Sequence, residues 1–308
     1  KLTLVSTHTP LAGARDVLIA GAAANVLGGV SGGDDIRGGS VRDLVLGDNG
    51  HIALNADGTM QKISSNMASL QTGQEFEVQP HIGGNDDIDV GNGDDIVIAG
   101  VGADYINWDR EVESSNPRLG QDSGSDVIIG DSGEAIFDVY NGVEALSEIR
   151  SIDDTNGGSD KIWTDGGVDV VIGGAGGDDI DAGTDDSRDI VVGDSGQVVF
   201  FDNQHEVVQS IESTTTDSGG SDEIIVGGGD DIVIGGADDD FINYTRERLQ
   251  IEGDTGADTI VGDSGKASFD FDDDTSSGIV REIRTTAPEH GGNDLIYAAD
   301  GSDTVFGG

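Results

Sequence analysis

Apolar residues recur in this chain at a fixed distance behind an acidic residue. In the segment 173–181, which reads GGAGGDDID, an aspartate follows a glycine-rich run and an isoleucine comes two residues later. The same order appears nine residues earlier, where Val171 follows Asp169, and nine residues before that, where Ile162 follows Asp160. A period of nine fits neither an amphipathic helix nor a long strand. It predicts a short turn followed by a short strand, repeated many times.

The pattern extends along the whole chain. The acidic position is occupied by Asp16, Asn25, Asp34, Asp43, Asp86, Asp95, Asp104, Asp126, Asp160, Asp169, Asp178, Asp189, Asp222, Asp231, Asp240, Asp258, Asp294 and Asp303. Leu, Ile or Val stands two residues after each of them. We expect these apolar residues to point inward from short parallel strands, because they are the one apolar position that every repeat shares.

A longer repeat is superimposed on the nine-residue one. Its mark is a Gly-Asp-x-Gly segment after an apolar pair, in which the aspartates are Asp48, Asp131, Asp194 and Asp263. Two interpretations of these aspartates stay open: an additional calcium ligand or turn lock, and a turn former with a solvent-facing carboxylate. We predict one elongated repeat array over residues 1–308, with cassettes 1–42 (partial), 43–125, 126–188, 189–257 and 258–308 (partial).

Each Gly-Asp-x-Gly segment leads into a stretch that predicts a β-hairpin, because β-branched and aromatic residues flank an Asn, Asp or Gly turn. The predicted strand pairs are His51–Leu54 with Met60–Ser64, Glu134–Asp138 with Val143–Ile152, Gln197–Asp202 with Glu206–Ser213, and Lys266–Phe271 with Gly278–Ile283. Three further stretches break the pattern and are interpreted as loops or lateral insertions: Met67–Pro80, Asn107–Asp122 and Tyr244–Asp254. No long segment has a helical period.

The charge of the chain excludes several classes of partner. Of 308 residues, 61 are Asp or Glu and 15 are Lys or Arg, which gives a net charge of −46. Such a chain repels nucleic acid and anionic membrane surfaces, and no apolar run is long enough for membrane insertion. A soluble acidic surface alone would produce the same composition. The repulsion nevertheless opposes a compact state unless a cation neutralises it.

The glycines and aspartates together provide a way to bind that cation. Glycines allow tight turns with positive φ angles, and such turns direct backbone carbonyls towards a point that the aspartate carboxylate also reaches. Oxygen ligands suit Ca²⁺, which takes about 6–8 of them, and the absence of cysteine excludes thiolate sites and disulfides. One turn supplies too few oxygens, so we expect multiple Ca²⁺ ions to bind between stacked turns. Turns stack on the same side if each coil contains two nine-residue units. The inward apolar residues then form a thin core between two sheets.

These nonapeptides, of the form GGxGxDxUx with U a large apolar residue, resemble those of the RTX (repeats-in-toxin, haemolysin-type calcium-binding) family. The resemblance implies an all-β fold, a calcium-bound parallel β-roll (β-helix solenoid), here interrupted by regularly spaced β-hairpins that the simple family pattern lacks. It also implies type I secretion from a Gram-negative bacterium, and a calcium-ligand role for the Asp at each sixth position. Asn25 carries no charge and Ala22–Ala24 replace expected glycines, so the first site is expected to be weaker.

Two short motifs that occur in enzymes lack the surroundings that the chemistry needs. His205-Glu206 begins a run similar to H-E-x-x-H, but Gln209 stands in place of the second histidine. Residues 29–33 fit G-x-S-x-G, but they lie in the nonapeptide series rather than between a strand and a helix. We therefore expect no catalytic site.

The sequence predicts a calcium-binding structural repeat segment of a large secreted or cell-surface bacterial protein, of the adhesin or surface-layer type, that folds on extracellular Ca²⁺. The alternative is a secretion and stability module of an extracellular enzyme (a lipase, protease or polysaccharide-modifying enzyme). Because the chain begins with Lys and ends in an incomplete repeat, we expect it to be part of a longer protein. Besides calcium, the expected interactions are lateral self-association with further copies of the chain, or contact with a cell surface or polysaccharide. Ice binding would need threonine ladders, and Thr214–Thr216 is isolated.

Overall fold

Strands are the regular elements of the computed structural model. It describes residues 4–6, 15–29, 32–65, 83–108, 122–140, 142–201, 204–214, 219–245, 250–251, 254–272, 277–287 and 290–307. Within these ranges there is no helix, and hence none long and apolar enough to cross a membrane. The predicted loop Met67–Pro80 and most of the predicted insertion Asn107–Asp122 lie outside the described residues.

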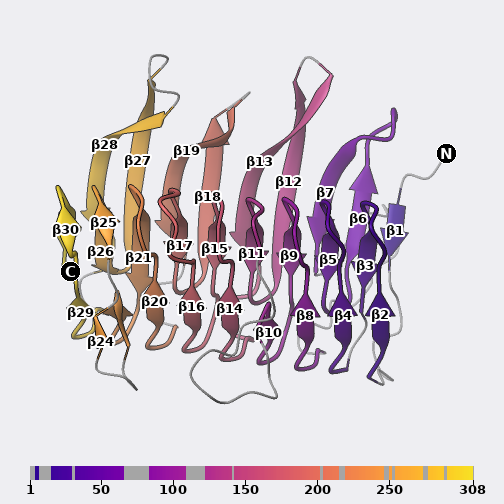
Figure 1. Cartoon of the computed structure of the whole chain (residues 1–308), viewed down its shortest axis with the longest axis horizontal. Helices are drawn as coiled ribbons and strands as arrows, with labels where there is room; N and C mark the ends of the chain where they lie inside the picture. The colour runs from indigo at the N-terminus through magenta and orange to yellow at the C-terminus, as the bar shows by residue number, and fades with distance from the viewer. Residues whose placement is uncertain are drawn as a thin grey trace.

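Two nine-stranded parallel sheets form the roll, and the chain visits them in turn. The first, called the outer sheet, contains β2 (Val17–Ile19), β4 (Asp35–Arg37), β8 (Asp87–Asp89), β10 (Tyr105–Ile106), β14 (Lys161–Trp163), β16 (Asp179–Asp181), β20 (Glu223–Ile225), β22 (Phe241–Ile242) and β29 (Leu295–Ile296). The second, called the middle sheet, contains β3 (Val26–Gly28), β5 (Leu44–Leu46), β9 (Ile96–Ile98), β11 (Val127–Ile129), β15 (Val170–Ile172), β17 (Ile190–Val192), β21 (Ile232–Gly236), β26 (Thr259–Asp263) and β31 (Thr304–Phe306). Figure 1 shows the coils stacked along the long axis of the molecule.

Each coil consists of two nonapeptides, one for each sheet. β2 pairs with β4 so that Leu18 lies opposite Ile36, and β3 pairs with β5 so that Leu27 lies opposite Val45. All but one of the apolar residues predicted to face inward form one cluster between the two sheets, in which most side chains are fully buried. The prediction is wrong for Val305, which is 45% exposed because it lies on β31, the end strand of the middle sheet. The predicted all-β parallel β-roll is confirmed.

A third nine-stranded sheet, called the hairpin sheet, covers the other face of the middle sheet. It is antiparallel and contains β1 (Leu4–Ser6), β6 (His51–Leu54), β7 (Met60–Ser64), β12 (Gly133–Tyr140), β13 (Val143–Ser151), β18 (Gly196–Phe201), β19 (Gln204–Ser213), β27 (Gly265–Asp272) and β28 (Ser277–Thr285). The four predicted hairpins all form. They also pair with one another, for example Ile149 with Val198 and Ile211 with Ala267.

Apart from its end strands β3 and β31, the middle sheet is therefore buried on both faces. Most of its strands carry three apolar residues in succession, such as Ile96-Val97-Ile98, in which the central side chain faces the outer sheet and its neighbours face the hairpin sheet. A second buried cluster joins these neighbours to hairpin residues such as Phe137, Phe200 and Phe269. Continuous apolar strands are typical of parallel sheets covered on both faces, and here the second cover comes from the hairpins.

Two small sheets contain the four remaining strands of the described residues. β23 (Tyr244–Thr245) pairs antiparallel with β24 (Gln250–Ile251) inside the predicted insertion Tyr244–Asp254. β25 (Thr255–Gly256) pairs in parallel with β30 (Asp300–Gly301).

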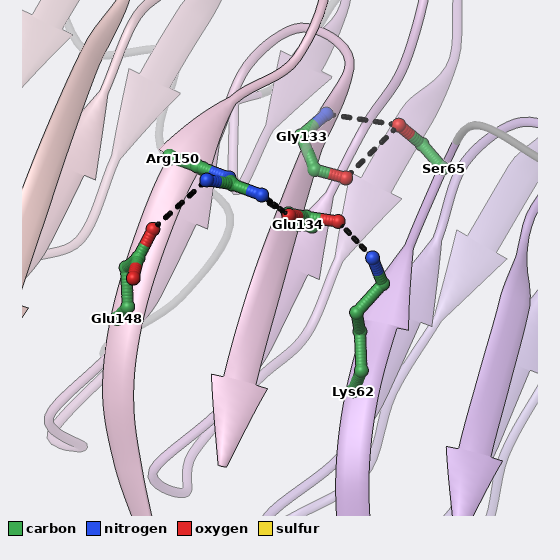
Figure 2. Close-up of polar contacts among 6 residues, drawn as sticks. All are labelled: Lys62, Ser65, Gly133, Glu134, Glu148 and Arg150. Carbon is green, nitrogen blue, oxygen red and sulfur yellow. Dashed lines mark hydrogen bonds and ion pairs between the residues drawn. The ribbon is translucent and has the colours of Figure 1, made fainter. Parts of the chain in front are cut away.

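The outward face of the hairpin sheet carries ion pairs across its strands (Figure 2). The Glu134 carboxylate accepts hydrogen bonds from Lys62 on β7 and from Arg150 on β13, the Arg150 Nε bond being 2.7 Å. Burial alone would raise the pKa of Glu134, but the bonds from these two cations lower it below its usual value. At the same junction the Gly133 N–H donates to Ser65 Oγ at 2.9 Å. These contacts connect one hairpin to the next.

We expect Ile211→Ala to destabilise the calcium-saturated protein by about 2–5 kcal/mol, the usual cost of truncating a buried aliphatic side chain. Ile211 is fully buried between the hairpin sheet and the middle sheet. Gln209→Ala, at an exposed position of the same strand, is the control and should be neutral. Thermal unfolding followed by circular dichroism measures both. A neutral Ile211→Ala would mean that the hairpin sheet contributes nothing to the core.

Candidate metal centres

The predicted ligands form two columns along the roll. The outer ladder lies just before the strands of the outer sheet and consists of Asp16, Asp34, Asp86, Asp104, Asp160, Asp178, Asp222, Asp240 and Asp294. The middle ladder lies just before the strands of the middle sheet and consists of Asn25, Asp43, Asp95, Asp126, Asp169, Asp189, Asp231, Asp258 and Asp303. Because the turns alternate between the two edges of the roll, residues 18 apart in a regular pair of coils become neighbours.

One carboxylate oxygen of each ladder residue after the first is used within the ladder. The backbone N–H of each member donates to the Oδ1 atom of the next, for example Asp160 to Asp178 and Asp178 to Asp222, both at 2.8 Å. The bonds of this type lie between 2.5 and 3.2 Å along both ladders. They fix the direction of the carboxylates that accept them.

The second carboxylate oxygen is buried and accepts no hydrogen bond in most ladder residues. This holds for the Oδ2 atoms of Asp86, Asp95, Asp126, Asp160, Asp169, Asp178, Asp189, Asp222, Asp231, Asp240, Asp258 and Asp294. A buried ionised oxygen without a donor is costly unless a cation contacts it. The donor set therefore fits a hard divalent cation such as Ca²⁺.

Glycine is required where the Oδ2 atoms of the outer ladder point. A methyl carbon on Gly130 would lie 2.3 Å from Asp160 Oδ2 and 2.4 Å from the Gly173 carbonyl oxygen. On Gly193 it would lie 2.1 Å from Asp222 Oδ2 and 2.4 Å from a carbonyl oxygen. Carboxylate and carbonyl oxygens thus converge beside each of these glycines, and any side chain would fill the cradle that they form.

Burial raises the pKa of the ladder carboxyl groups. The pKa of Asp86 rises to about 9, through burial first and then through the charges of Asp104 and Asp48. That of Asp189 rises to about 10, through burial and the charge of Asp169. Burial is also the largest cause of the raised pKa of Asp95, Asp126, Asp160, Asp169, Asp178, Asp222, Asp231, Asp240, Asp258 and Asp294. Full ionisation of both ladders at neutral pH needs added positive charge.

The ladders are less enclosed at the ends of the roll. Asp16 is exposed, and Asn25, Asp294 and Asp303 are half-buried. The Asn25 amide nitrogen donates to the carbonyl oxygens of Ala23 and Gly21 and to Asp43 Oδ1 at 2.8 Å. In the first coil the Asn25 amide nitrogen thus contacts carbonyl and carboxylate oxygens, the same types of oxygen that converge beside the glycines of the later coils.

The four cassette aspartates, Asp48, Asp131, Asp194 and Asp263, are buried and hydrogen-bonded where the chain leaves the roll for a hairpin. Asp131 Oδ1 accepts the Gly158 N–H at 3.2 Å and Oδ2 accepts the Ala175 N–H at 2.5 Å, so the carboxylate contacts turns of two successive coils. Asp48 and Asp194 accept equivalent pairs, and Asp263 accepts the Gly292 N–H. This geometry is that of a turn lock, and a further role as a calcium ligand stays a prediction.

Two further acidic residues, which the sequence did not single out as ligands, lie beside residues of the middle ladder. Asp122 lies with Asp95 and Asp126, and Asp254 lies with Asp231 and Asp258, each group having carboxylate atoms within 4.8 Å of one another. Their position in the repeat was a usable signal, since each stands four residues before a ladder aspartate, where the repeat has its second glycine.

The geometry describes a β-roll with a metal-binding donor set at its turns. A family model described as the RTX calcium-binding nonapeptide repeat matches residues 82–107, 154–188, 216–245, 250–266 and 290–308. These segments of the chain are therefore RTX calcium-binding nonapeptide repeats, and the predicted presence of such repeats is confirmed. The matched segments leave out the hairpins β6–β7, β12–β13 and β18–β19. No curated protein matches the chain.

Proposed function

We propose that this chain is a structural segment of a large secreted or cell-surface bacterial protein, of the adhesin or surface-layer type, which folds when it binds several Ca²⁺ ions. The buried, unpartnered Oδ2 atoms of both ladders carry this proposal. Those of the outer ladder, such as Asp160 and Asp222, also lie beside glycine turns at successive levels of the roll. Bound Ca²⁺ supplies the positive charge that lets neighbouring carboxylates stay ionised. The ladder aspartates hold their carboxylates in place through the Oδ1 bonds, and the turn glycines keep the cradle open.

We infer an extracellular location, and two observations support it. RTX repeats occur in proteins that are exported by type I secretion, and at low calcium a chain of net charge −46 resists compaction, which suits passage through a secretion channel. Extracellular calcium modules bind with dissociation constants of about 10⁻⁴–10⁻³ M. Folding outside the cell is then driven by the binding free energy.

We further propose that the array consists of the five cassettes predicted from the sequence and that this segment has no catalytic role. The periodic spacing of the aspartates, which would otherwise allow carboxylate pairs for glycosidic chemistry, is explained by the ladders. Contact with a cell surface or polysaccharide, or lateral assembly of copies, would then be the task of the exposed faces. The rest of the reading frame distinguishes the two alternatives. Further repeats and adhesive domains would favour an adhesin, and a catalytic domain would favour the structural module of an extracellular enzyme.

Calcium titration of the full chain by calorimetry, with circular dichroism in parallel, tests the proposed function. We expect on the order of a dozen ions per chain, because each ion requires about 6–8 oxygens from two neighbouring turns. The β signal should rise together with binding. Absence of calcium binding at millimolar concentrations would contradict the proposal.

A further inference from the structure

The middle ladder contains two places where a third carboxylate joins two ladder aspartates. Asp122 lies beside Asp95 and Asp126 in one place, and the second place has the same arrangement with Asp254, Asp231 and Asp258. All six carboxylates are buried, with exposed fractions of 5% or less. Within the described residues these are the two groups of three carboxylates whose atoms lie within 4.8 Å of one another.

The third carboxylate is held by an asparagine at the start of an inserted segment. Asn107 has a φ of 53°, its Oδ1 accepts the Val90 N–H at 2.9 Å, and its Nδ2 donates to Asp122 Oδ2 at 3.2 Å. The remaining oxygen, Asp122 Oδ1, accepts the Ser123 N–H at 2.7 Å and the Gly124 N–H at 3.3 Å. Asp122 is thus fixed beside the ladder.

The second copy repeats this arrangement independently. Asn243 has a φ of 55°, its Oδ1 accepts the Val226 N–H at 3.1 Å, and its Nδ2 donates to Asp254 Oδ2 at 2.6 Å. Here the first oxygen, Asp254 Oδ1, is buried and accepts no hydrogen bond. The third carboxylates of the two copies are 132 residues apart in the sequence. The copies share the asparagine contact and the grouping of three carboxylates, and they differ at this oxygen, because Asp122 Oδ1 accepts two backbone bonds.

Unpartnered oxygens point to a ligand in both places. The Oδ2 atoms of Asp95 and Asp126 are buried without a hydrogen-bond partner, and so are those of Asp231 and Asp258. Asp254 Oδ1 adds a third such atom to the second group. Three buried carboxylates at this separation repel one another strongly unless a cation lies among them.

We propose that Asp122 and Asp254 are additional ligands that turn two positions of the middle ladder into three-carboxylate divalent-cation sites, the tightest sites of the roll. The inference rests on the calcium function proposed above. It goes beyond that function because it assigns a ligand role to Asp122 and Asp254 and states that their two sites bind calcium more tightly than the others. Calcium affinity rises with the number of charged ligands. Each site also ties the end of an inserted segment, through Asn107 or Asn243, to the ladder.

Asp185 provides a matched control. It occupies the same place in its repeat, four residues before Asp189. Its carboxylate is already engaged: Oδ1 accepts the Ser187 N–H at 3.1 Å, and Oδ2 accepts the Ser187 hydroxyl at 2.7 Å and the Gly167 N–H at 3.2 Å. It belongs to neither three-carboxylate group.

Equilibrium dialysis of the full chain against buffered calcium tests the proposal. As free calcium is lowered, the unmodified protein should retain two ions after the others have dissociated. Asp122→Asn and Asp254→Asn should each retain one and the double variant none, because each substitution weakens its site by about tenfold or more. Asp185→Asn should retain two. Circular dichroism at millimolar calcium checks that every variant is folded, and the two separate copies provide a second test if one variant does not fold.

Identical retention curves for the unmodified protein and the folded double variant would overturn the assignment of Asp122 and Asp254, while leaving the calcium function intact. Equal loss in Asp185→Asn would also overturn it, since any acidic residue at this repeat position would then have the same effect. If the unmodified protein retained no calcium even at millimolar concentration, the proposed function itself would fail.

Discussion

Calcium-free protein should be folded at about pH 4 and should lose its β structure as the pH rises towards about 9, because the ladder carboxyl groups have raised pKa values in the folded state. A folded state with raised pKa values binds more protons than the unfolded chain. Its stability is therefore complete below the ordinary Asp pKa of about 4 and is lost as the pH passes the folded values. These are about 7 for Asp169, about 8 for Asp231 and about 10 for Asp189.

The expected loss is large compared with the stability of a domain. For Asp169 alone, the rise of the pKa from 3.8 to about 7 corresponds to about 4 kcal/mol, at about 1.4 kcal/mol per pH unit. A few such carboxylates exceed the net stability of about 5–15 kcal/mol that is typical of a domain. At pH 8, calcium should restore the fold, because the cation replaces the protons.

Circular dichroism melts between pH 4 and pH 9, with and without calcium, measure this effect. The difference in Tm between the two series should grow with pH and should be small at pH 4. Sodium chloride at equal ionic strength is the control for general screening of the net charge. A calcium-free chain that keeps its full β signal at pH 8 in low salt would contradict the prediction.

The roll could be predicted from the sequence because its determinants are local and repeated. Each inward apolar residue, such as Ile88 or Val97, stands at a fixed offset from a ladder aspartate, and both are fully buried. The period of nine also predicts two units per coil, which the pairing of Leu18 with Ile36 confirms.

The hairpin sheet could be predicted only in part. Each hairpin is local and carries its own turn signal, so its presence was predictable. The pairing of one hairpin with the next, such as Ile149 with Val198, depends on the stacking of the coils between them. A signal for this cover was present, since the triplet Ile96-Val97-Ile98 is apolar throughout, whereas its outer-sheet counterpart Asp87-Ile88-Asp89 is not.

The candidate sites show the same division between local and non-local determinants. The ladder aspartates follow the repeat and were predicted by position, and their role as ligands stays a prediction. Asp122 and Asp254 were not singled out because they stand where the repeat has glycine, beyond inserted segments of different length. Their importance depends on proximity to residues of neighbouring coils, which only the structure brings together.

Gly193→Ala should lower both the stability and the calcium affinity of the roll. The added methyl carbon would lie 2.1 Å from Asp222 Oδ2 and 2.4 Å from the Gly235 carbonyl oxygen, so it would displace oxygens that converge there. Gly193 does not have a positive φ, which leaves the lost space as the cause. Steric strain costs about 1–3 kcal/mol. Loss of one calcium site costs a further amount of about 2.7 kcal/mol when the calcium concentration is about 100 times Kd.

The calcium dependence of this loss separates the two contributions. Stabilisation by a bound ligand grows with the logarithm of its concentration, so the difference in unfolding free energy between the unmodified protein and Gly193→Ala should widen as calcium is raised. A steric defect alone would give a constant difference and would show that the cradle holds no cation. Gly21→Ala is the matched control, because a methyl carbon there would meet nothing within 4 Å and φ is not positive. Its melting curve should follow that of the unmodified protein at every calcium concentration.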